Sequence, residues 1–182
     1  MTRTRANPIT GMSKFSIVVL LTILLITSLI VIVLWRPSQR PIQSPVVGCS
    51  SNLKQLGILM SLYAKDHDGK YPDPNRWCDS LIKHFKPLKP IDKRFVCPGA
   101  KAVPSHYAMN PNADPNGPSD LVLLFDTKGG WNQYGGPEML TFDNHRGKYC
   151  NIVFVDYHVE LIEPNDVGRL RWEVGQNGER MK

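Results

Sequence analysis

An uncharged apolar run from Phe15 to Trp35 constrains this chain more than any other feature of its sequence. Its 21 residues would form a helix of about 31 Å, close to the ~30 Å hydrocarbon core of a bilayer. A cleavable signal peptide has a shorter apolar region followed by a small-residue cleavage site, whereas this run ends in LWRP. The sequence therefore predicts a retained transmembrane helix over residues 15–35.

Basic residues on both sides of the run bear on its orientation. Three precede it and two follow it: Arg3, Arg5 and Lys14, then Arg36 and Arg40. Because basic residues favour the cytoplasmic side, residues 1–14 are predicted to be a cytoplasmic tail. We expect a single-pass protein of the cytoplasmic (inner) membrane, with membrane lipid as one partner and the rest of the chain on the extracytoplasmic side.

The net charge of +6 belongs mainly to these flanks. Without the five flanking residues, 17 basic residues stand against 16 acidic ones, and every acidic residue lies beyond residue 47. A nucleic-acid-binding protein needs its basic patch on the folded domain. The near-neutral domain therefore excludes nucleic acid as an expected partner.

Proline and glycine divide the rest of the chain. Residues 36–48 contain three prolines among polar residues, which predicts a Pro-rich stalk. A compact domain is expected over residues 49–166, followed by a polar C-terminal tail over residues 167–182. A helix should begin near Cys49 and end at Asp68-Gly69, since glycine tolerates the left-handed turn that closes a helix.

Short apolar segments beyond this helix alternate with turn residues, which is typical of an antiparallel sheet. The expected segments are residues 94–97, 121–125, 151–155 and 158–162, after a short helix over residues 77–85. The sequence thus predicts an α+β fold in which the helix packs on a small antiparallel sheet. The expected core joins Leu53, Leu56, Met60 and Tyr63 to Leu123, Phe125, Ile152, Phe154, Val159 and Leu161, with Lys54 turned away.

Three phrases in this order resemble one family. They are CSSNLKQLGILMSLYAKDHDGKYPD, then FVCPGA with SHYAMN, and last HRGKYCNIVFVDYHVELI. Together they resemble the pilin-like proteins of planctomycete type, which are related to the major pseudopilin of type II secretion. The resemblance implies a pseudopilin-like domain that serves as a component or accessory of a secretion or pilus-type assembly in the cell envelope.

The chain departs from that family at its N-terminus and in its closing hairpin. Lys14 stands before Phe15, where the family has Gly, and Val19 occupies the position of the membrane-buried Glu of polymerising pilins. Tyr157 replaces the Gly of the family's Asp-Gly turn. The expected function is therefore a membrane-anchored structural or interaction module with protein partners or copies of itself, and not a polymerising major subunit.

Four cysteines lie on the expected outer side, and an even number in an exported domain indicates disulfides. Their order in the chain leaves three pairings open, with reduced buried thiols as the alternative. The resembling family places cysteines at the positions of Cys49 and Cys97. The resemblance thus implies a Cys49–Cys97 bridge, and leaves Cys78 to pair with Cys150.

No cofactor is expected, but two kinds of metal site remain as alternatives. Zinc would suit Asp126 together with the pairs Asp143–His145 and Asp156–His158, and a metal-dependent hydrolase is the enzyme alternative. Loop capping and a hairpin turn explain the same residues without a metal. Calcium would suit the acidic turn Asp66, Asp68 and Asp73, or the segment Asn112-x-Asp114-x-Asn116, where Leu123 replaces the closing Glu.

Aromatic residues offer a third alternative, an extracytoplasmic binding module. The loop over residues 127–137 contains four glycines together with Trp131 and Tyr134, and Trp77 and Trp172 lie elsewhere in the domain. Gathered on one surface, these rings would hold a glycan or a protein partner. A structural or interaction role without catalysis remains the favoured prediction.

Overall fold

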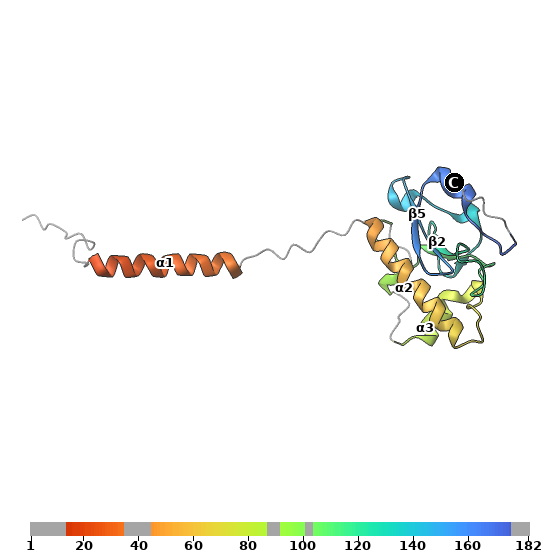
Figure 1. Cartoon of the computed structure of the whole chain (residues 1–182), viewed down its shortest axis with the longest axis horizontal. Coiled ribbons are helices and arrows are strands. Elements are labelled where there is room, and N and C mark those ends of the chain that lie inside the picture. The colour runs from red at the N-terminus through yellow and green to blue at the C-terminus, as the bar shows by residue number, and fades with distance from the viewer. Residues whose placement is uncertain (1–13, 35–44, 87–91, 101–103, 176–182) are drawn as a thin grey trace, which may run out of the picture. The chain divides into compact units, whose positions relative to one another are not determined.

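The computed structural model describes residues 14–34, 45–86, 92–100 and 104–175. The chain separates into two compact units, residues 1–42 and residues 43–182. In the first unit, helix α1 spans Lys14–Leu34 without interruption (Figure 1) and is long and apolar enough to cross a membrane. The hydroxyls of Thr22 and Thr27 donate to the carbonyls of Val19 and Leu24, so these polar side chains are satisfied within the helix itself. The predicted helix is confirmed; its expected last residue lies outside the described residues.

The second unit begins with helix α2, Pro45–Lys65. This helix starts four residues before the predicted Cys49, because proline is tolerated at a first helical position, where no backbone hydrogen bond is lost. The last four residues of the expected stalk are therefore helical, and the others lie outside the described residues. At the other end, Asp68 and Gly69 both have positive φ, and the amide of Gly69 donates to the carbonyl of Ala64 at 2.9 Å. The predicted stop at this turn is confirmed.

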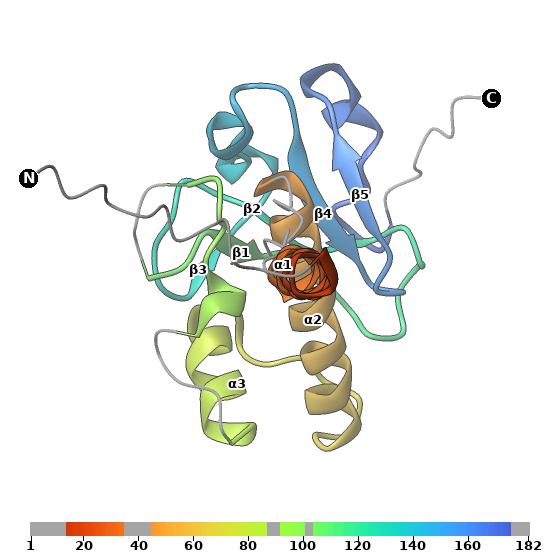
Figure 2. The same cartoon turned by 90° about the vertical axis from the view of Figure 1, so that its left-hand side faces the viewer.

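Short helices follow. The 3₁₀ turn η1 (Pro74–Arg76) leads into α3 (Trp77–His84), which lies beside α2 (Figure 2). The predicted strand over residues 94–97 is wrong: its first two residues belong to the 3₁₀ turn η2 (Lys93–Phe95). The side chain of Asp92 accepts from the amide of Arg94 and caps that turn.

In the described part of the domain, five strands form one sheet in the order β3-β1-β2-β4-β5. They are β1 (Tyr107–Met109), β2 (Val122–Asp126), β3 (Gln133–Tyr134), β4 (Cys150–Phe154) and β5 (Val159–Ile162). Neighbouring strands are antiparallel except β1 and β3, which are parallel. The fold is therefore α+β with a small mixed sheet, and the expectation of a wholly antiparallel sheet is wrong at this one edge.

The sheet separates two cores. The core on the α2 side includes the predicted Leu53, Leu56, Met60 and Leu123, together with Leu121, Leu124, Val153 and Val155. The core on the other side includes Phe125, Ile152, Phe154, Ile162 and Trp172. The two cores bury both faces of β2 and β4 completely.

Side chains alternate along β4 as expected, but the predicted face is wrong for Ile152 and Phe154, which lie in the second core, while Val159 packs on the α2 side as predicted. Val153 and not Ile152 packs toward α2, and Leu161 is 45% exposed. In β2, the register shifts between Val122 and Leu124, which places Phe125 in the second core. A shift of one residue moves a side chain to the opposite face of a sheet, and no apolar pattern in a strand buried on both faces reveals it.

The C-terminal segment belongs to the domain beyond the expected boundary at residue 166. After the 3₁₀ helix η5 (Pro164–Arg169), Leu170 and Trp172 are buried in the second core. Leu121 bridges to Arg171, and the amide of Val122 donates to the Arg171 carbonyl at 3.0 Å. The predicted polar tail is thus wrong up to Trp172.

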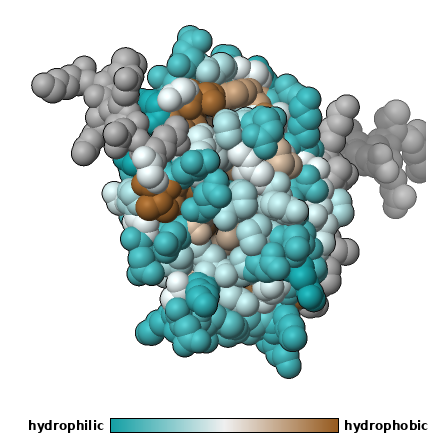
Figure 3. All heavy atoms as spheres, turned by 90° about the vertical axis from the view of Figure 1, so that its right-hand side faces the viewer, coloured by the Kyte–Doolittle hydropathy of each residue, from teal (hydrophilic) through white to brown (hydrophobic). Residues whose placement is uncertain are grey.

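The face of the domain in Figure 3 is mostly hydrophilic, with apolar residues in small separate patches.

Candidate functional site

The structure places the five predicted metal ligands in three different surroundings. Asp126 and His145 are buried side by side, with side chains that have no exposed surface. The Asp143 side chain is 76% exposed and lies near Lys128. Asp156 and His158 contact each other on the half-exposed turn between β4 and β5. The structure therefore forms two separate pairs, Asp126–His145 and Asp156–His158, and leaves the exposed Asp143 outside both.

Asp126 accepts hydrogen bonds at the end of β2. Its Oδ2 accepts from the backbone amide and from the side-chain Nδ2 of Asn151, both at 2.8 Å, and lies 3.0 Å from His145 Nε2. Asn151 belongs to β4, the strand that pairs with β2, so the sheet itself positions these donors. The carboxylate is thereby fixed in the interior of the domain.

His145 closes the 3₁₀ turn η4 (Asp143–His145). The next residue, Arg146, has a left-handed conformation with φ 59°, and the turn is completed by a bond from the Gly147 amide to the Phe142 carbonyl. His145 Nε2 lies 2.8 Å from Asn151 Nδ2 and 3.6 Å from Cys97 Sγ. The ring therefore stands between the Asp126 carboxylate and a sulfur.

That sulfur belongs to the disulfide Cys49–Cys97, which the resemblance implied and the structure contains. Cys49 lies in the first turns of α2, and Cys97 follows η2. The side chain of Asn52 donates to the carbonyls of Val96, at 2.8 Å, and Lys93, at 3.1 Å, so α2 also holds this loop by hydrogen bonds. The bridge closes a separation of 48 residues.

The second expected bridge, Cys78–Cys150, is wrong. Both residues are buried free thiols. Cys78 packs in the core on the α2 side and Cys150 in the core on the other side, so the sheet lies between them. Burial raises the pKa of the Cys78 thiol to about 12, and burial together with the nearby charge of Asp126 raises the pKa of Cys150. The alternative of reduced buried thiols holds for these two.

Four possible metal ligands meet at the disulfide. One sulfur each from Cys49 and Cys97, a carboxylate oxygen of Asp126 and a ring nitrogen of His145 all lie within 4.8 Å of one another, and all four residues are buried. Asp126 Oδ1 and His145 Nδ1 have no hydrogen-bond partner among the described residues. The cysteines were expected as a bridge and the two other residues as metal candidates, and no sequence pattern indicated that all four share one site.

Sequence reasoning also missed two residues that support this cluster. Asn151 holds Asp126 with two donors, and the hydroxyl of Ser50 donates to Asn151 Oδ1. These contacts join the first turns of α2 to β4 and to the end of β2. No spacing in the sequence indicates them, because the three segments are far apart along the chain.

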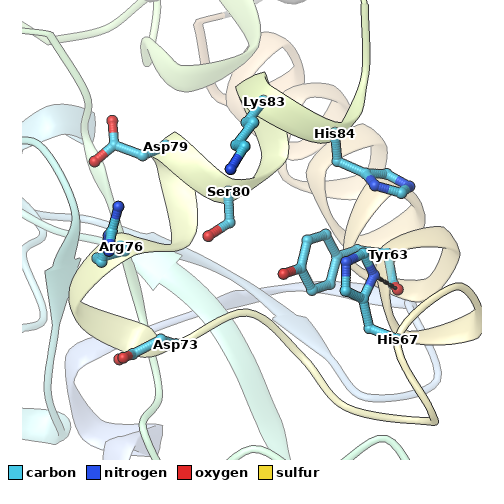
Figure 4. Close-up of a pocket in the computed structure, with 8 residues that line it drawn as sticks. All are labelled: Tyr63, His67, Asp73, Arg76, Asp79, Ser80, Lys83 and His84. Atoms are coloured by element: carbon cyan, nitrogen blue, oxygen red, sulfur yellow. Dashed lines mark hydrogen bonds between the residues drawn. The ribbon is translucent and has the colours of Figure 1, made fainter.

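A separate polar cleft of about 450 Å³ lies between the end of α2 and α3 (Figure 4). Its lining consists of Tyr63, His67, Asp73, Arg76, Asp79, Ser80, Lys83 and His84. The rings of Tyr63 and His67 are stacked at 3.7 Å, and His84 meets both edge-on. Charges of both signs line the cleft, so its electrostatic potential does not favour a ligand of one particular charge.

The aromatic residues expected to form a binding surface differ in their burial. Trp77 is buried and donates to the Gln133 carbonyl at 2.9 Å. Trp131 contacts the Phe95 ring and donates to Asp79 at 2.8 Å, and Trp172 lies in the second core. Tyr134 is exposed and Trp131 is half-buried, so two of these four rings reach the surface.

The expected calcium ligands take part in turns. Asp73 caps η1, and Asp66 pairs with His84 at 3.0 Å. Asp114 accepts from the amide of Asn116 at 2.9 Å, which is the usual role of an Asp that begins a turn. These contacts agree with the turn interpretation of both segments.

No protein family, no characterised protein and no solved structure matches this chain.

Proposed function

We propose that this protein is a single-pass, membrane-anchored structural or interaction module of the cell envelope. Its domain would be pilin-like and extracytoplasmic, and it would serve as a component or accessory of a secretion or pilus-type assembly. The observation that carries the proposal is the pairing of an uninterrupted apolar helix, exposed along its described length, with a separate disulfide-closed domain. Apolar side chains exposed around a whole helix need a lipid or protein environment, and a disulfide is typical of the oxidising side of that membrane.

The first turn of α1 supports a role outside the filament shaft. It contains no acidic residue, and Val19 stands at the position of the family's glutamate. In a polymerising pilin, that carboxylate can pair with the amino terminus of a neighbouring subunit within the membrane. This chain would lack that interaction and would remain an anchored subunit.

The arrangement of the domain favours interaction over catalysis. The Asp126–His145 pair is enclosed, while Asp143, Asp156 and His158 lie elsewhere on the surface. Exposed Ile58 and Leu62, four residues apart on α2, present an apolar pair on the outside of the domain. Such a pair suits contact with another protein.

Topology is tested with two reporter cysteines, each introduced alone into the full-length chain, whose own free thiols are buried. Lys128→Cys lies on the domain, where the native side chain is 79% exposed, and Thr4→Cys lies in the N-terminal tail. A membrane-impermeant maleimide should label the first and not the second in intact cells, and alkaline carbonate should leave both proteins in the membrane. Release by carbonate, or labelling of the tail in preference to the domain, would contradict the proposal.

The interaction role is tested by photo-crosslinking in living cells. A photoreactive residue at Ile58 or Leu62 should give discrete adducts, either with envelope proteins or with a second copy of the chain. Lys128, an exposed residue just after β2, serves as the control position. The absence of adducts from both α2 positions, or the same adducts from the control position, would exclude this surface as the contact.

A further inference from the structure

We propose that Cys49, Cys97, Asp126 and His145 form a zinc site when the two cysteines are thiols. The disulfide and the metal would then be alternative occupants of one position. Either would tie the start of α2 to the loop after η2, but the metal would also tie both to β2 and η4. This proposal does not depend on the proposed envelope function.

The donor set matches zinc. Two thiolates, one imidazole and one carboxylate give four ligands of the kinds that zinc binds, in the number its tetrahedral structural sites use. The four ligand atoms already lie within 4.8 Å of one another. Burial of all four residues excludes the solvent that would otherwise compete for the metal.

Unpartnered polar atoms in the cluster favour a cation there. The Asp126 side chain has no exposed surface, yet its Oδ1 lacks a hydrogen-bond partner among the described residues. A buried carboxylate oxygen without a donor is costly, and a bound cation would remove that cost. Oδ2 would keep its two bonds from Asn151, which would orient the carboxylate as a second layer of partners does in known metal sites.

His145 is placed to supply Nε2 as the ligand atom. Nε2 lies 3.6 Å from Cys97 Sγ, 3.0 Å from Asp126 Oδ2 and 2.8 Å from Asn151 Nδ2, and zinc would take the place of the Asn151 contact at this nitrogen. The opposite nitrogen, Nδ1, lies beside Gly99, where an added Cβ would come within 3.4 Å of it and within 2.4 Å of the Asn144 carbonyl. The Nδ1 side of the ring is therefore packed against Gly99, and the Nε2 side faces the sulfurs.

Conversion between the two occupants requires one redox step. A phosphine and water reduce the disulfide to two thiols, and the phosphine becomes its oxide. Each thiol then releases its proton to solvent as its sulfur binds Zn²⁺. The sulfurs, joined at 2.02 Å in the disulfide, would separate to about 3.8 Å around a tetrahedral zinc with Zn–S bonds of about 2.3 Å.

The test uses the full-length chain in mild detergent, reduced with a phosphine under nitrogen and titrated with Zn²⁺ against a chelating dye. We expect one zinc ion per reduced chain and none at comparable affinity in the oxidised chain. X-ray absorption should report two sulfur and two nitrogen or oxygen ligands. Bound zinc should also raise the thermal midpoint of the reduced chain, in a manner that depends on zinc concentration.

Variants assign the ligands. Cys49→Ser/Cys97→Ser should abolish tight binding, and Asp126→Asn or His145→Gln should weaken it by about tenfold or more. Circular dichroism of the oxidised Asp126 and His145 variants, which retain the disulfide, shows whether they fold. The matched control is Cys78→Ser/Cys150→Ser, which removes the two other thiols and should keep one zinc ion per chain.

Three results would overturn the proposal. One is a reduced wild-type chain that binds zinc no more tightly than Cys49→Ser/Cys97→Ser. Another is loss of binding in Cys78→Ser/Cys150→Ser with retention in Cys49→Ser/Cys97→Ser. The third is unchanged affinity in folded Asp126→Asn and His145→Gln, which would remove both residues from the ligand set.

Discussion

Asp126 and His145 stand 19 residues apart in the sequence, and Asp126 Oδ2 lies 3.0 Å from His145 Nε2 in the structure. Neither side chain has any exposed surface. Their contact joins the end of β2 to the turn η4, and the neighbouring Cys49–Cys97 bridge joins both to α2. One buried polar cluster thus connects α2, the sheet and a surface turn.

Replacement of Asp126 by alanine should destabilise the domain by about 2–5 kcal/mol, because two donors of Asn151 lose their acceptor in the interior. Urea unfolding of the oxidised protein measures the effect. Asp143→Ala is the matched control, since that side chain is 76% exposed and its removal should leave the free energy of unfolding nearly unchanged. Equal losses for the two variants would show that the buried network does not stabilise the fold.

Loss of the Cys49–Cys97 bridge should cost about 4 kcal/mol in the presence of a chelator, since the bridge closes a separation of 48 residues in the unfolded chain. The free energy of unfolding of the oxidised protein is compared with that of the phosphine-reduced protein. Cys49→Ser/Cys97→Ser is the control, because its stability should not respond to the phosphine. Peptide mapping without reduction should recover Cys49 linked to Cys97; a bridge to Cys78 or Cys150 would disprove this pairing.

The thiols of Cys78 and Cys150 should resist alkylation in the folded protein. Because the thiolate is the reactive form and burial raises the pKa of Cys78 to about 12, this thiol stays protonated at pH 8 and would ionise only as the pH approaches that value. Iodoacetamide followed by mass spectrometry should modify neither residue in buffer and both in concentrated urea. Rapid native modification of either one would mean that its core opens to solvent.

The two faces of the sheet can be distinguished by a pair of substitutions. Val153→Asp places an unpaired charge in the core beneath α2 and should cost several kcal/mol, whereas Leu161→Asp changes a side chain that is 45% exposed. Thermal midpoints measured side by side make the comparison. If Leu161→Asp were the more damaging change, Leu161 and not Val153 would face the core, as the sequence predicted.

The close approach of α2 to β4 depends on Gly57. A Cβ at this position would lie 3.0 Å from Val153 Cγ2 and 3.6 Å from the Tyr157 ring, so Gly57→Leu should force the helix from the sheet at a cost of about 1–3 kcal/mol or more. Ile58→Leu, at an exposed neighbouring position, is the control for a change within the same helical turn. Chemical denaturation of both variants tests the contact, which would be refuted by equal midpoints.

Features of the chain with a local cause could be predicted from the sequence. The apolar run predicted α1, and the spacing of Leu53, Leu56 and Met60 predicted the buried face of α2. Both patterns repeat within a single element, so neighbouring residues are enough to reveal them. The Cys49–Cys97 bridge came instead from the resemblance to pilin-like proteins, because spacing alone left three pairings open.

Features with a tertiary cause could not be predicted. The side of the sheet on which Ile152 lies depends on the register of β4, and β4 is apolar on both faces. Tyr157 adopts φ 68°, a conformation that a tyrosine rarely takes, so the path of the chain between β4 and β5 could not be read from residue type. The Asp126–His145 cluster needs four segments to meet, so the sequence could name these two residues as metal candidates but could not place Cys49 and Cys97 beside them.

The fully buried strand β2 has a consequence for the chain before it folds. Residues 121–125, LVLLF, are uncharged and rich in residues that favour strands, the kind of segment through which unfolded chains aggregate. Acidic residues flank the segment on both sides, Asp120 before it and Asp126 after it. In the folded protein these two acids make other contacts. Asp120 Oδ1 lies 2.8 Å from Arg171 Nε, and Asp126 lies in the buried cluster. In a chain that has not yet folded, the same two charges act as gatekeepers, because like charges repel when two such segments approach each other.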